Sequence, residues 1–228
     1  MIQEHPAGKG QQMRSGKRQS KEKIGFSGTA AALALLVFIM TGAVCLVLNL
    51  RPLYYADIRL MKIPEYSGLS AEAVRENYDV LIDYNQVWNR NELAFPSLPM
   101  SQSGKIHFEE VKRIFDGIQI ACLVSGLCLV FLIPLMLLFR KRRWLFVTGI
   151  LALLLPAAAG ILVLVDWERF FVTFHQLVFR NDFWLFDPAV DPVITILPDG
   201  YFEQCAVLIV VIVLLAGVLC LRLSRRKS

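Results

Sequence analysis

Two histidines, His107 and His175, have the side chains of this sequence best suited to proton transfer near neutral pH. Imidazole has an unperturbed pKa that lets it take up and release protons in this range. His175 lies in Asp166–Phe186, where at 100° per residue it borders a face of large aromatic side chains. His107 shares a face of a predicted helix with Val111 and Ile114. We therefore expect either an acid–base pair or two packed histidines bonded to backbone carbonyls.

Other kinds of catalytic site have weaker support. His107, His175, Glu110 and Asp182 are suitable zinc donors, but no His-x-x-x-His or His-Glu-x-x-His spacing occurs, so we expect no metal or other cofactor. The Gly-x-Ser-x-Gly motif of a serine nucleophile and a Gly-rich phosphate loop are both missing. The 5 cysteines lie in or at the ends of apolar runs, so they offer no thiol nucleophile in a loop.

Four long uncharged runs indicate the elements that position the histidines. The chain is 56% hydrophobic, and the runs cover residues 24–50, 117–139, 144–165 and 204–221. About 20 apolar residues suffice for a helix to cross a bilayer, whose interior offers the backbone no other hydrogen-bond partners. The sequence therefore predicts an all-α membrane protein with four transmembrane helices.

The distribution of charge predicts the topology. Residues 1–23, 140–143 and 222–228 contain 14 of the 24 Lys and Arg residues but only 2 of the 19 Asp and Glu residues. Because basic residues stay on the cytoplasmic side, we expect two basic cytoplasmic tails, 1–23 and 222–228, and a cytoplasmic turn at 140–143. Residues 51–116 and 166–203 then form two extracellular loops. The basic tails reflect this topology, so we expect no nucleic-acid partner.

Both extracellular loops are predicted to be helical and to form a cap over the bundle. In the first loop, Ser70 is a candidate N-cap. It precedes an apolar stripe at helical spacing: Val74, Tyr78, Leu81, Asn85 and Trp88. Asn85 is either a buried hydrogen-bonding residue or a polar group in a site. If the helices of His107 and His175 continue the adjacent spans, both imidazoles stand about 15 Å outside the apolar runs and meet there.

Four blocks of residues carry a family resemblance: Tyr84-Asn85, Ser103-Gly104-x-x-His107-Phe108, Phe174-His175 and Phe179-x-Asn181-Asp182-x-Trp184. In a four-span frame with two long outer loops, this pattern resembles the bacterial lipoprotein intramolecular transacylase (Lit) family. The resemblance implies an acyltransferase at the outer face of the cell membrane of a Gram-positive bacterium. It also implies that His107 and His175 are catalytic. Residues expected to bind or orient the substrate are Tyr84, Asn85, Asn181, Asp182 and Trp184.

The implied substrate is a lipoprotein whose N-terminal cysteine carries a diacylglyceryl group. The sn-2 acyl chain would move to the α-amino group of the same cysteine, giving an N-acyl-S-monoacylglyceryl lipoprotein. Since ester and amine belong to one molecule, no acyl-enzyme is required. We expect His175 to be the base and His107 the acid, although the sequence leaves this order open. The expected partners are diacylglyceryl lipoproteins and membrane lipid, and the expected state is a monomer. The alternatives are a metal-dependent membrane hydrolase and a non-catalytic membrane scaffold.

Overall fold

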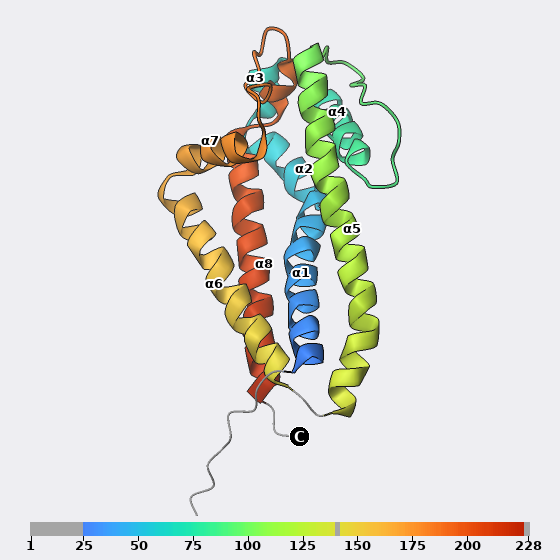
Figure 1. The fold of residues 1–228 in the computed structure, drawn as a ribbon. Helices are drawn as coiled ribbons and strands as arrows, with labels where there is room; N and C mark the ends of the chain where they lie inside the picture. The colour runs from blue at the N-terminus through green and yellow to red at the C-terminus, as the bar shows by residue number, and fades with distance from the viewer. Residues whose placement is uncertain (1–24, 140–141, 226–228) are drawn as a thin grey trace, which may run out of the picture.

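The computed structural model describes residues 25–139 and 142–225, and all regular elements in them are helical (Figure 1). Four long helices run side by side: α1 (Phe26–Leu48), α5 (Gln102–Leu138), α6 (Arg143–Val165) and α8 (Asp199–Arg225). Shorter elements gather at one end: α2 (Arg51–Leu60), α3 (Ile63–Ser67), α4 (Ala71–Tyr84), α7 (Trp167–Val178) and the 3₁₀ helix η1 (Pro192–Ile196). We call this end the head and the rest the stem. The predicted tail 1–23, part of the turn 140–143 and the last 3 residues lie outside the described residues.

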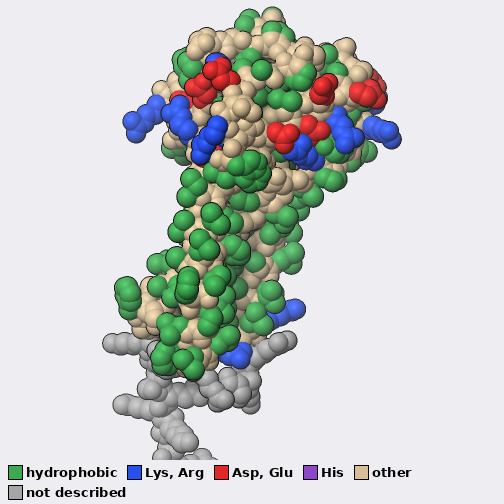
Figure 2. Space-filling view, turned by 90° about the vertical axis from the view of Figure 1, so that its right-hand side faces the viewer, with side chains coloured by type: hydrophobic (Ala, Val, Ile, Leu, Met, Phe, Trp, Pro, Cys, Tyr) green, Lys and Arg blue, Asp and Glu red, His purple; other side chains and the backbone are tan. Residues whose placement is uncertain are grey.

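The four long helices are long and apolar enough to cross a membrane. Their most apolar segments have mean hydropathies of 2.7, 2.7, 2.5 and 3.0 in chain order. Figure 2 shows acidic side chains only on the wide head, basic ones at the head and the far end of the stem, and a mainly apolar surface between. The expectation of an all-α protein with four membrane spans is thus confirmed.

Small residues let the helices of the stem approach closely. A Cβ added to Gly217 of α8 would lie 3.2 Å from both the Ala152 side chain and the Gly149 carbonyl of α6. The Thr148 hydroxyl donates a hydrogen bond to the Ala32 carbonyl of α1 over 3.1 Å. Such packing is typical of helices in a bilayer, where contact and hydrogen bonding between helices replace the hydrophobic effect.

The first loop folds into helices whose starts follow local sequence signals. Pro52 and Pro64 lie in the first turns of α2 and α3. Proline has no backbone N–H, and at this position the N–H would have no partner within the helix, so no hydrogen bond is lost. The Ser70 side chain accepts a hydrogen bond from the Ala73 N–H over 3.2 Å, which confirms the predicted N-cap. The predicted stripe is wrong at its end: α4 stops at Tyr84, and Trp88 is 74% exposed.

A tyrosine cluster joins the two loops in the core of the head. The rings of Tyr54 on α2 and Tyr78 on α4 stack with centroids 3.7 Å apart. The Tyr78 and Tyr201 hydroxyls lie 2.7 Å apart, and the Tyr54 hydroxyl donates to the Ile196 carbonyl over 2.5 Å. Buried tyrosines stabilise a core when their hydroxyls find partners, as here. The first loop, η1 and the start of α8 therefore form one packed unit.

The two helices that carry the histidines relate differently to their spans. Helix α5 runs without interruption through 37 residues and carries His107 in its second turn, as predicted. The condition that the His175 helix continues the third span is not met. Helix α6 ends at Val165. Asp166 has a non-helical backbone, with φ −156° and ψ 89°, and its side chain caps α7 by accepting from the Arg169 N–H. Helix α7 consequently turns away from α6 and lies across the end of the bundle (Figure 1).

Candidate functional site

His107 and His175 meet at the junction of head and stem. Their ring centroids are 6.2 Å apart, and the ring planes are inclined by 31°. His107 is 5% exposed on α5, whereas His175 is half-buried on α7. The predicted meeting of the two imidazoles is confirmed, although it arises through the turn at Asp166.

Aromatic rings surround both imidazoles. The Phe179 ring lies 4.8 Å from that of His107 and 5.5 Å from that of His175. Phe186 approaches His107 at 5.4 Å, while Phe171 and Trp184 lie 4.0 and 4.9 Å from His175. These rings form an apolar enclosure that limits water around the two imidazoles and strengthens electrostatic interactions between groups inside it.

The hydrogen bond of His175 determines which of its nitrogens carries the proton. Its Nδ1 lies 2.8 Å from the carbonyl oxygen of Phe171, one turn earlier on α7. A carbonyl can only accept, so Nδ1–H is the donor and the lone pair of the neutral ring lies on Nε2. Among the described residues, the bond from Nδ1 is the only side-chain hydrogen bond of His175, so the lone pair on Nε2 can accept a proton.

His107 favours the opposite tautomer. Its Nδ1 is buried without a hydrogen-bond partner among the described residues. A buried N–H without an acceptor is less favourable than a buried lone pair, so the proton belongs on Nε2. The pair therefore combines a hydrogen-bond donor, Nε2–H of His107, with a proton acceptor, Nε2 of His175.

Both imidazoles are neutral at pH 7. Burial, assisted by the neighbouring His175, lowers the pKa of His107 from its ordinary value of 6.5 to about 4. Burial also lowers the pKa of His175, against the opposing effect of its bond to the Phe171 carbonyl. A neutral imidazole can both donate through one nitrogen and accept through the other, which an imidazolium cannot.

A polar contact holds the segment after α7 against α5. The Asn181 side-chain amide donates to both carboxylate oxygens of Glu110, over 3.1 and 3.2 Å. Glu110 lies three residues after His107 and therefore on the same side of α5. Asn181 thus anchors the segment that brings Phe179 onto His107.

Replacing Asn181 by aspartate should loosen this segment more than replacing it by alanine. Asn181→Asp places a second carboxylate against Glu110, and like charges at this distance repel. We expect a lower melting temperature for Asn181→Asp than for Asn181→Ala, measured in detergent by intrinsic fluorescence. Adding Glu110→Gln to Asn181→Asp restores an amide–carboxylate pair and should recover most of the loss. Equal melting temperatures for the two single variants would contradict this role.

The other residues predicted to orient a substrate lie at different places. Trp184 is buried against His175, and its Nε1 has no partner among the described residues. The Asp182 carboxylate is exposed, and within residues 25–139 and 142–225 it makes no hydrogen bond or ion pair. Trp184 is therefore at the imidazole pair, while Asp182 points to solvent.

Tyr84 and Asn85 connect α4 with α5. The Tyr84 ring is buried in the head core, with the Lys112 ammonium 5.3 Å from its centroid. The Asn85 amide donates to the Leu81 carbonyl over 3.0 Å, and its backbone carbonyl accepts from Gln119 over 2.8 Å. Asn85 is thus a buried hydrogen-bonding residue, although its Oδ1 lacks a partner in the described part of the chain. Among the described contacts, no hydrogen bond or ring contact joins Tyr84 or Asn85 to either histidine.

The candidate zinc donors do not converge. Glu110 is engaged by Asn181, and Asp182 is exposed. In the described ranges, no three His, Cys, Asp or Glu side chains lie close enough together to hold a metal ion. The arrangement is thus suited to proton transfer by two imidazoles and lacks the third donor of a catalytic zinc site.

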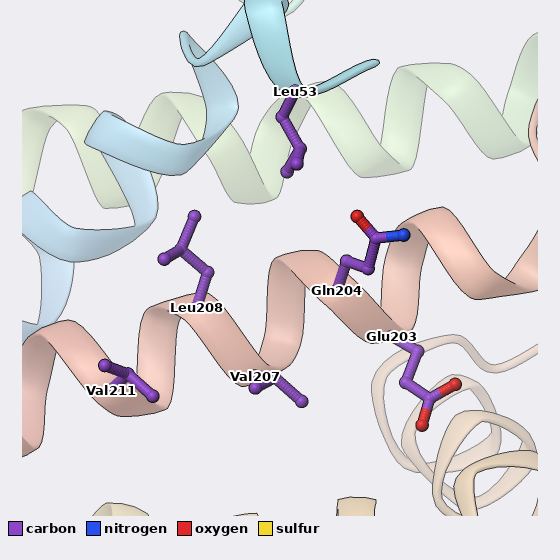
Figure 3. A pocket seen from close by; sticks show the side chains of 6 residues that line it. All are labelled: Leu53, Glu203, Gln204, Val207, Leu208 and Val211. Carbon is purple, nitrogen blue, oxygen red and sulfur yellow. The ribbon is translucent and has the colours of Figure 1, made fainter. Parts of the chain in front are cut away.

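A separate apolar groove lies on another face of α8 (Figure 3). It has a volume of about 390 Å³ and is lined by Leu53, Glu203, Gln204, Val207, Leu208 and Val211. Phe202 faces the histidine site, since its ring lies 6.1 Å from that of Phe171. Gln204 and Val211 lie about 180–200° around α8 from Phe202 at 3.6 residues per turn, so the groove faces away from the imidazoles.

Sequence patterns gave Glu110 only as a possible zinc donor and did not place Phe171 or Phe186 at this site. Phe171 could have been found from its position one turn before His175, and Glu110 from its position one turn after His107. Phe186 offered no local signal, because it reaches His107 only through the fold of the second loop.

Comparisons with known proteins agree with this architecture. The family model described as lipoprotein intramolecular transacylase Lit matches residues 29–202. Among solved structures, the membrane integral lipoprotein intramolecular transacylase Lit from Bacillus cereus is 32% identical, with a TM-score of 0.84 over 87% of this chain and 93% of that chain. Two structures of Lit from Bacillus cereus with one histidine replaced, by arginine or by alanine, are each 31% identical with a TM-score of 0.77. These two matches cover 87% of this chain and 89% and 90% of those chains. A search of curated proteins found no match.

Proposed function

The chain belongs to the lipoprotein intramolecular transacylase (Lit) family, and on this premise we propose that it moves the sn-2 acyl chain of a diacylglyceryl group to the α-amino group of the lipidated N-terminal cysteine. It is a membrane-integral acyltransferase of lipoprotein maturation with four apolar helices. Family membership sets aside the non-catalytic scaffold. The proposed product is an N-acyl-S-monoacylglyceryl lipoprotein.

The imidazole pair is the observation that carries this proposal. Its rings lie 6.2 Å apart, with one nitrogen able to donate and another able to accept a proton. An ester and an amine that belong to one small lipid group are close enough together to contact two such neighbouring imidazoles at once. The substrate itself holds the two reacting groups together, and such tethering corresponds to effective molarities of about 10⁵–10⁸ M in well-oriented cases.

The proposed reaction begins with attack of the α-amine nitrogen on the carbonyl carbon of the sn-2 ester. As the C–N bond forms, Nε2 of His175 takes a proton from the nitrogen. Nε2–H of His107 donates to the carbonyl oxygen as it becomes negative. The bond from the carbonyl carbon to the sn-2 oxygen then breaks, and the departing oxygen takes up the proton held by His175, while His107 keeps its Nε2–H as the donor to the carbonyl oxygen. Both rings thus return to their starting state.

An acyl-enzyme has no part in this scheme. The five cysteines are free, and all of them lie in the four long helices. Cys205 is near the start of α8. Ser101 and Ser103, at the start of the helix that carries His107, bond to one another, and the Ser101 hydroxyl also donates to Asp191. Among the described residues, neither serine has a contact with a histidine. Direct transfer from oxygen to nitrogen within the substrate therefore agrees best with the residues available.

We place the active site on the extracellular side of the membrane. Basic residues concentrate at 1–23, 140–143 and 222–228. In the sequence these segments adjoin the start of α1, the end of α5, the start of α6 and the end of α8, and these four helix ends lie opposite the head (Figure 1). Positive charge favours the cytoplasmic side. The head and its imidazoles then meet the outer leaflet, where helix α7 exposes Phe174 and Leu177 to lipid. Labelling of cysteines placed singly in the head, with a reagent that cannot cross the membrane, tests this orientation.

The pH dependence of kcat/KM should show two ionisations on its acidic side. The attacking α-amine must be neutral, and its pKa is about 7.7–8.0, so log(kcat/KM) should fall with a slope of one below that range. His175 must also be neutral, and its lowered pKa adds a second unit of slope only below pH 6.5. Initial rates with a synthetic diacylglyceryl lipopeptide measure this profile. An enzyme ionisation at pH 7 or above would contradict it.

Expression in a bacterium that makes only diacylated lipoproteins tests reaction and substrate together. Lipopeptide mass spectrometry should then detect acyl chains on the N-terminal nitrogen and one acyl chain fewer on glycerol. The mass of the whole lipopeptide stays unchanged, because the reaction only moves the chain. Unmodified N-termini, despite correctly folded protein in the membrane, would overturn the proposed function.

A further inference from the structure

Asp191 is a buried carboxylate outside the imidazole pair. It is 4% exposed, and burial of a charge is unfavourable unless hydrogen bonds satisfy it. Both of its oxygens bind Ser101, the N-cap of α5: Oδ1 accepts from the backbone N–H and Oδ2 from the hydroxyl, each over 2.6 Å. The positive end of the helix dipole further favours a carboxylate there. Asp191 thus ties the second loop to the first turn of the helix that carries His107.

Gly104 makes this close approach possible. A Cβ at this position would lie 2.6 Å from Oδ1 of Asp191, closer than real Cβ contacts allow, and 3.1 Å from its Cγ, which is also tight. Gly104 has an ordinary helical backbone in α5. Glycine is therefore needed here because it leaves space for the Asp191 side chain, not because of its backbone conformation. It lies three residues before His107, one turn towards the start of the helix.

The second loop therefore runs antiparallel to α5 and is anchored on both sides of His107. One anchor is Asn181 on Glu110, one turn after His107, and the other is Asp191 at Ser101 and Gly104. Phe186, between these anchors, and Phe179, two residues before the first of them, cover the imidazole of His107 with ring centroids 5.4 and 4.8 Å away. Asp191 also leads directly into η1, whose Val193 and Ile196 are fully buried in the head core.

We propose that Asp191 is a positioning residue for acyl transfer: its bonds to Ser101 hold the second loop over His107, keep the two imidazoles aligned and exclude water from the reacting ester. This inference rests on the proposed function. Because the alignment depends on both anchors, loss of Asp191 lets the Phe179–Phe186 segment move and admits water. Water then competes with the α-amine for the sn-2 carbonyl carbon. That side reaction forms a C–O bond to water, breaks the ester bond and leaves a free fatty acid, a free sn-2 hydroxyl and an unacylated amine.

The test compares transfer with hydrolysis in the full-length enzyme reconstituted in lipid nanodiscs with a synthetic diacylglyceryl lipopeptide. Two variants disturb the contact from opposite sides, Asp191→Asn and Gly104→Ala. Asp187→Asn is the matched control, because Asp187 is an exposed carboxylate of the same loop whose bond to the Ala189 N–H an asparagine can also make. Mass spectrometry counts N-acylated product and released fatty acid, and melting temperatures report the folded fraction.

We expect kcat for transfer to fall about tenfold in Asp191→Asn and about 100-fold in Gly104→Ala, since small misplacements of reacting groups have effects of this size. The fraction of substrate hydrolysed should rise in both, and Asp187→Asn should behave as wild type. A partly unfolded enzyme would lower both reactions together and leave their ratio unchanged. A wild-type ratio of transfer to hydrolysis in both variants therefore overturns the inference. Absence of N-acylated product from the wild type overturns the proposed function and this inference with it.

Discussion

His175→Ala is expected to lower the rate of acyl transfer by about 10²–10⁴-fold, the usual contribution of a positioned general base. The substitution removes Nε2, the lone pair left free by the bond from Nδ1–H to the Phe171 carbonyl. The ring also contributes contacts with Phe171 and Trp184, but most of the effect should be on kcat. Formation of N-acyl lipopeptide from a synthetic substrate, followed by mass spectrometry, measures the loss.

Two comparisons separate the chemistry of His175 from its packing. Gln176→Ala changes the next residue on α7, an exposed side chain, and should leave the rate close to wild type. Added imidazole can enter the space left in His175→Ala and should restore part of the activity, more so at a pH where imidazole is neutral. Undiminished conversion by His175→Ala would remove this residue from the mechanism.

His107→Ala is expected to reduce kcat by about 10²–10³-fold, as found when one donor to a developing oxyanion is lost. The reason is that Nε2–H is the donor left facing the site once Nδ1 is buried. Its low pKa, about 4, keeps the ring neutral, so it acts as a hydrogen-bond donor over the working pH range.

Glutamine substitutions distinguish the roles of the two histidines. The amide nitrogen of glutamine can occupy the place of Nε2 and donate a hydrogen bond, but the side chain is not basic. His107→Gln should therefore keep more activity than His107→Ala, whereas His175→Gln should be as impaired as His175→Ala. The reverse pattern would exchange the roles of acid and base. Glu109→Ala, an exposed neighbour on α5, is the control for His107.

Local patterns predicted the long helices and several of their ends. Ser70 caps α4 as its neighbours in sequence imply, and α5 continues from His107 into the membrane. Such features depend on residues within one or two turns, so they are present in the sequence itself. Trp88 was predicted to extend the apolar stripe of α4, but the helix ends at Tyr84. Asn85 caps this end by contacts with Leu81 and with Gln119 of α5, which lies 34 residues away.

The break between α6 and α7 at Asp166 is a second feature that local sequence patterns did not predict. An uninterrupted apolar run followed by an aromatic helix is compatible with one long helix or with two. The non-helical backbone of Asp166, together with its capping bond from the Arg169 N–H, selects two helices, and α7 can then cross the bundle towards α5. Without that turn, the helix of His175 would continue along the axis of α6.

The sequence by itself determined the four spans, the two histidines and the family to which their surroundings belong, because hydropathy and short motifs are local properties. The tertiary structure alone decided that the imidazoles stand 6.2 Å apart and that Glu110 and Asp191 hold the second loop in place. Those features come from contacts between residues about 70–90 positions apart in the chain. Such contacts depend on how the helices pack and where the loops turn, and no spacing of neighbouring residues encodes them.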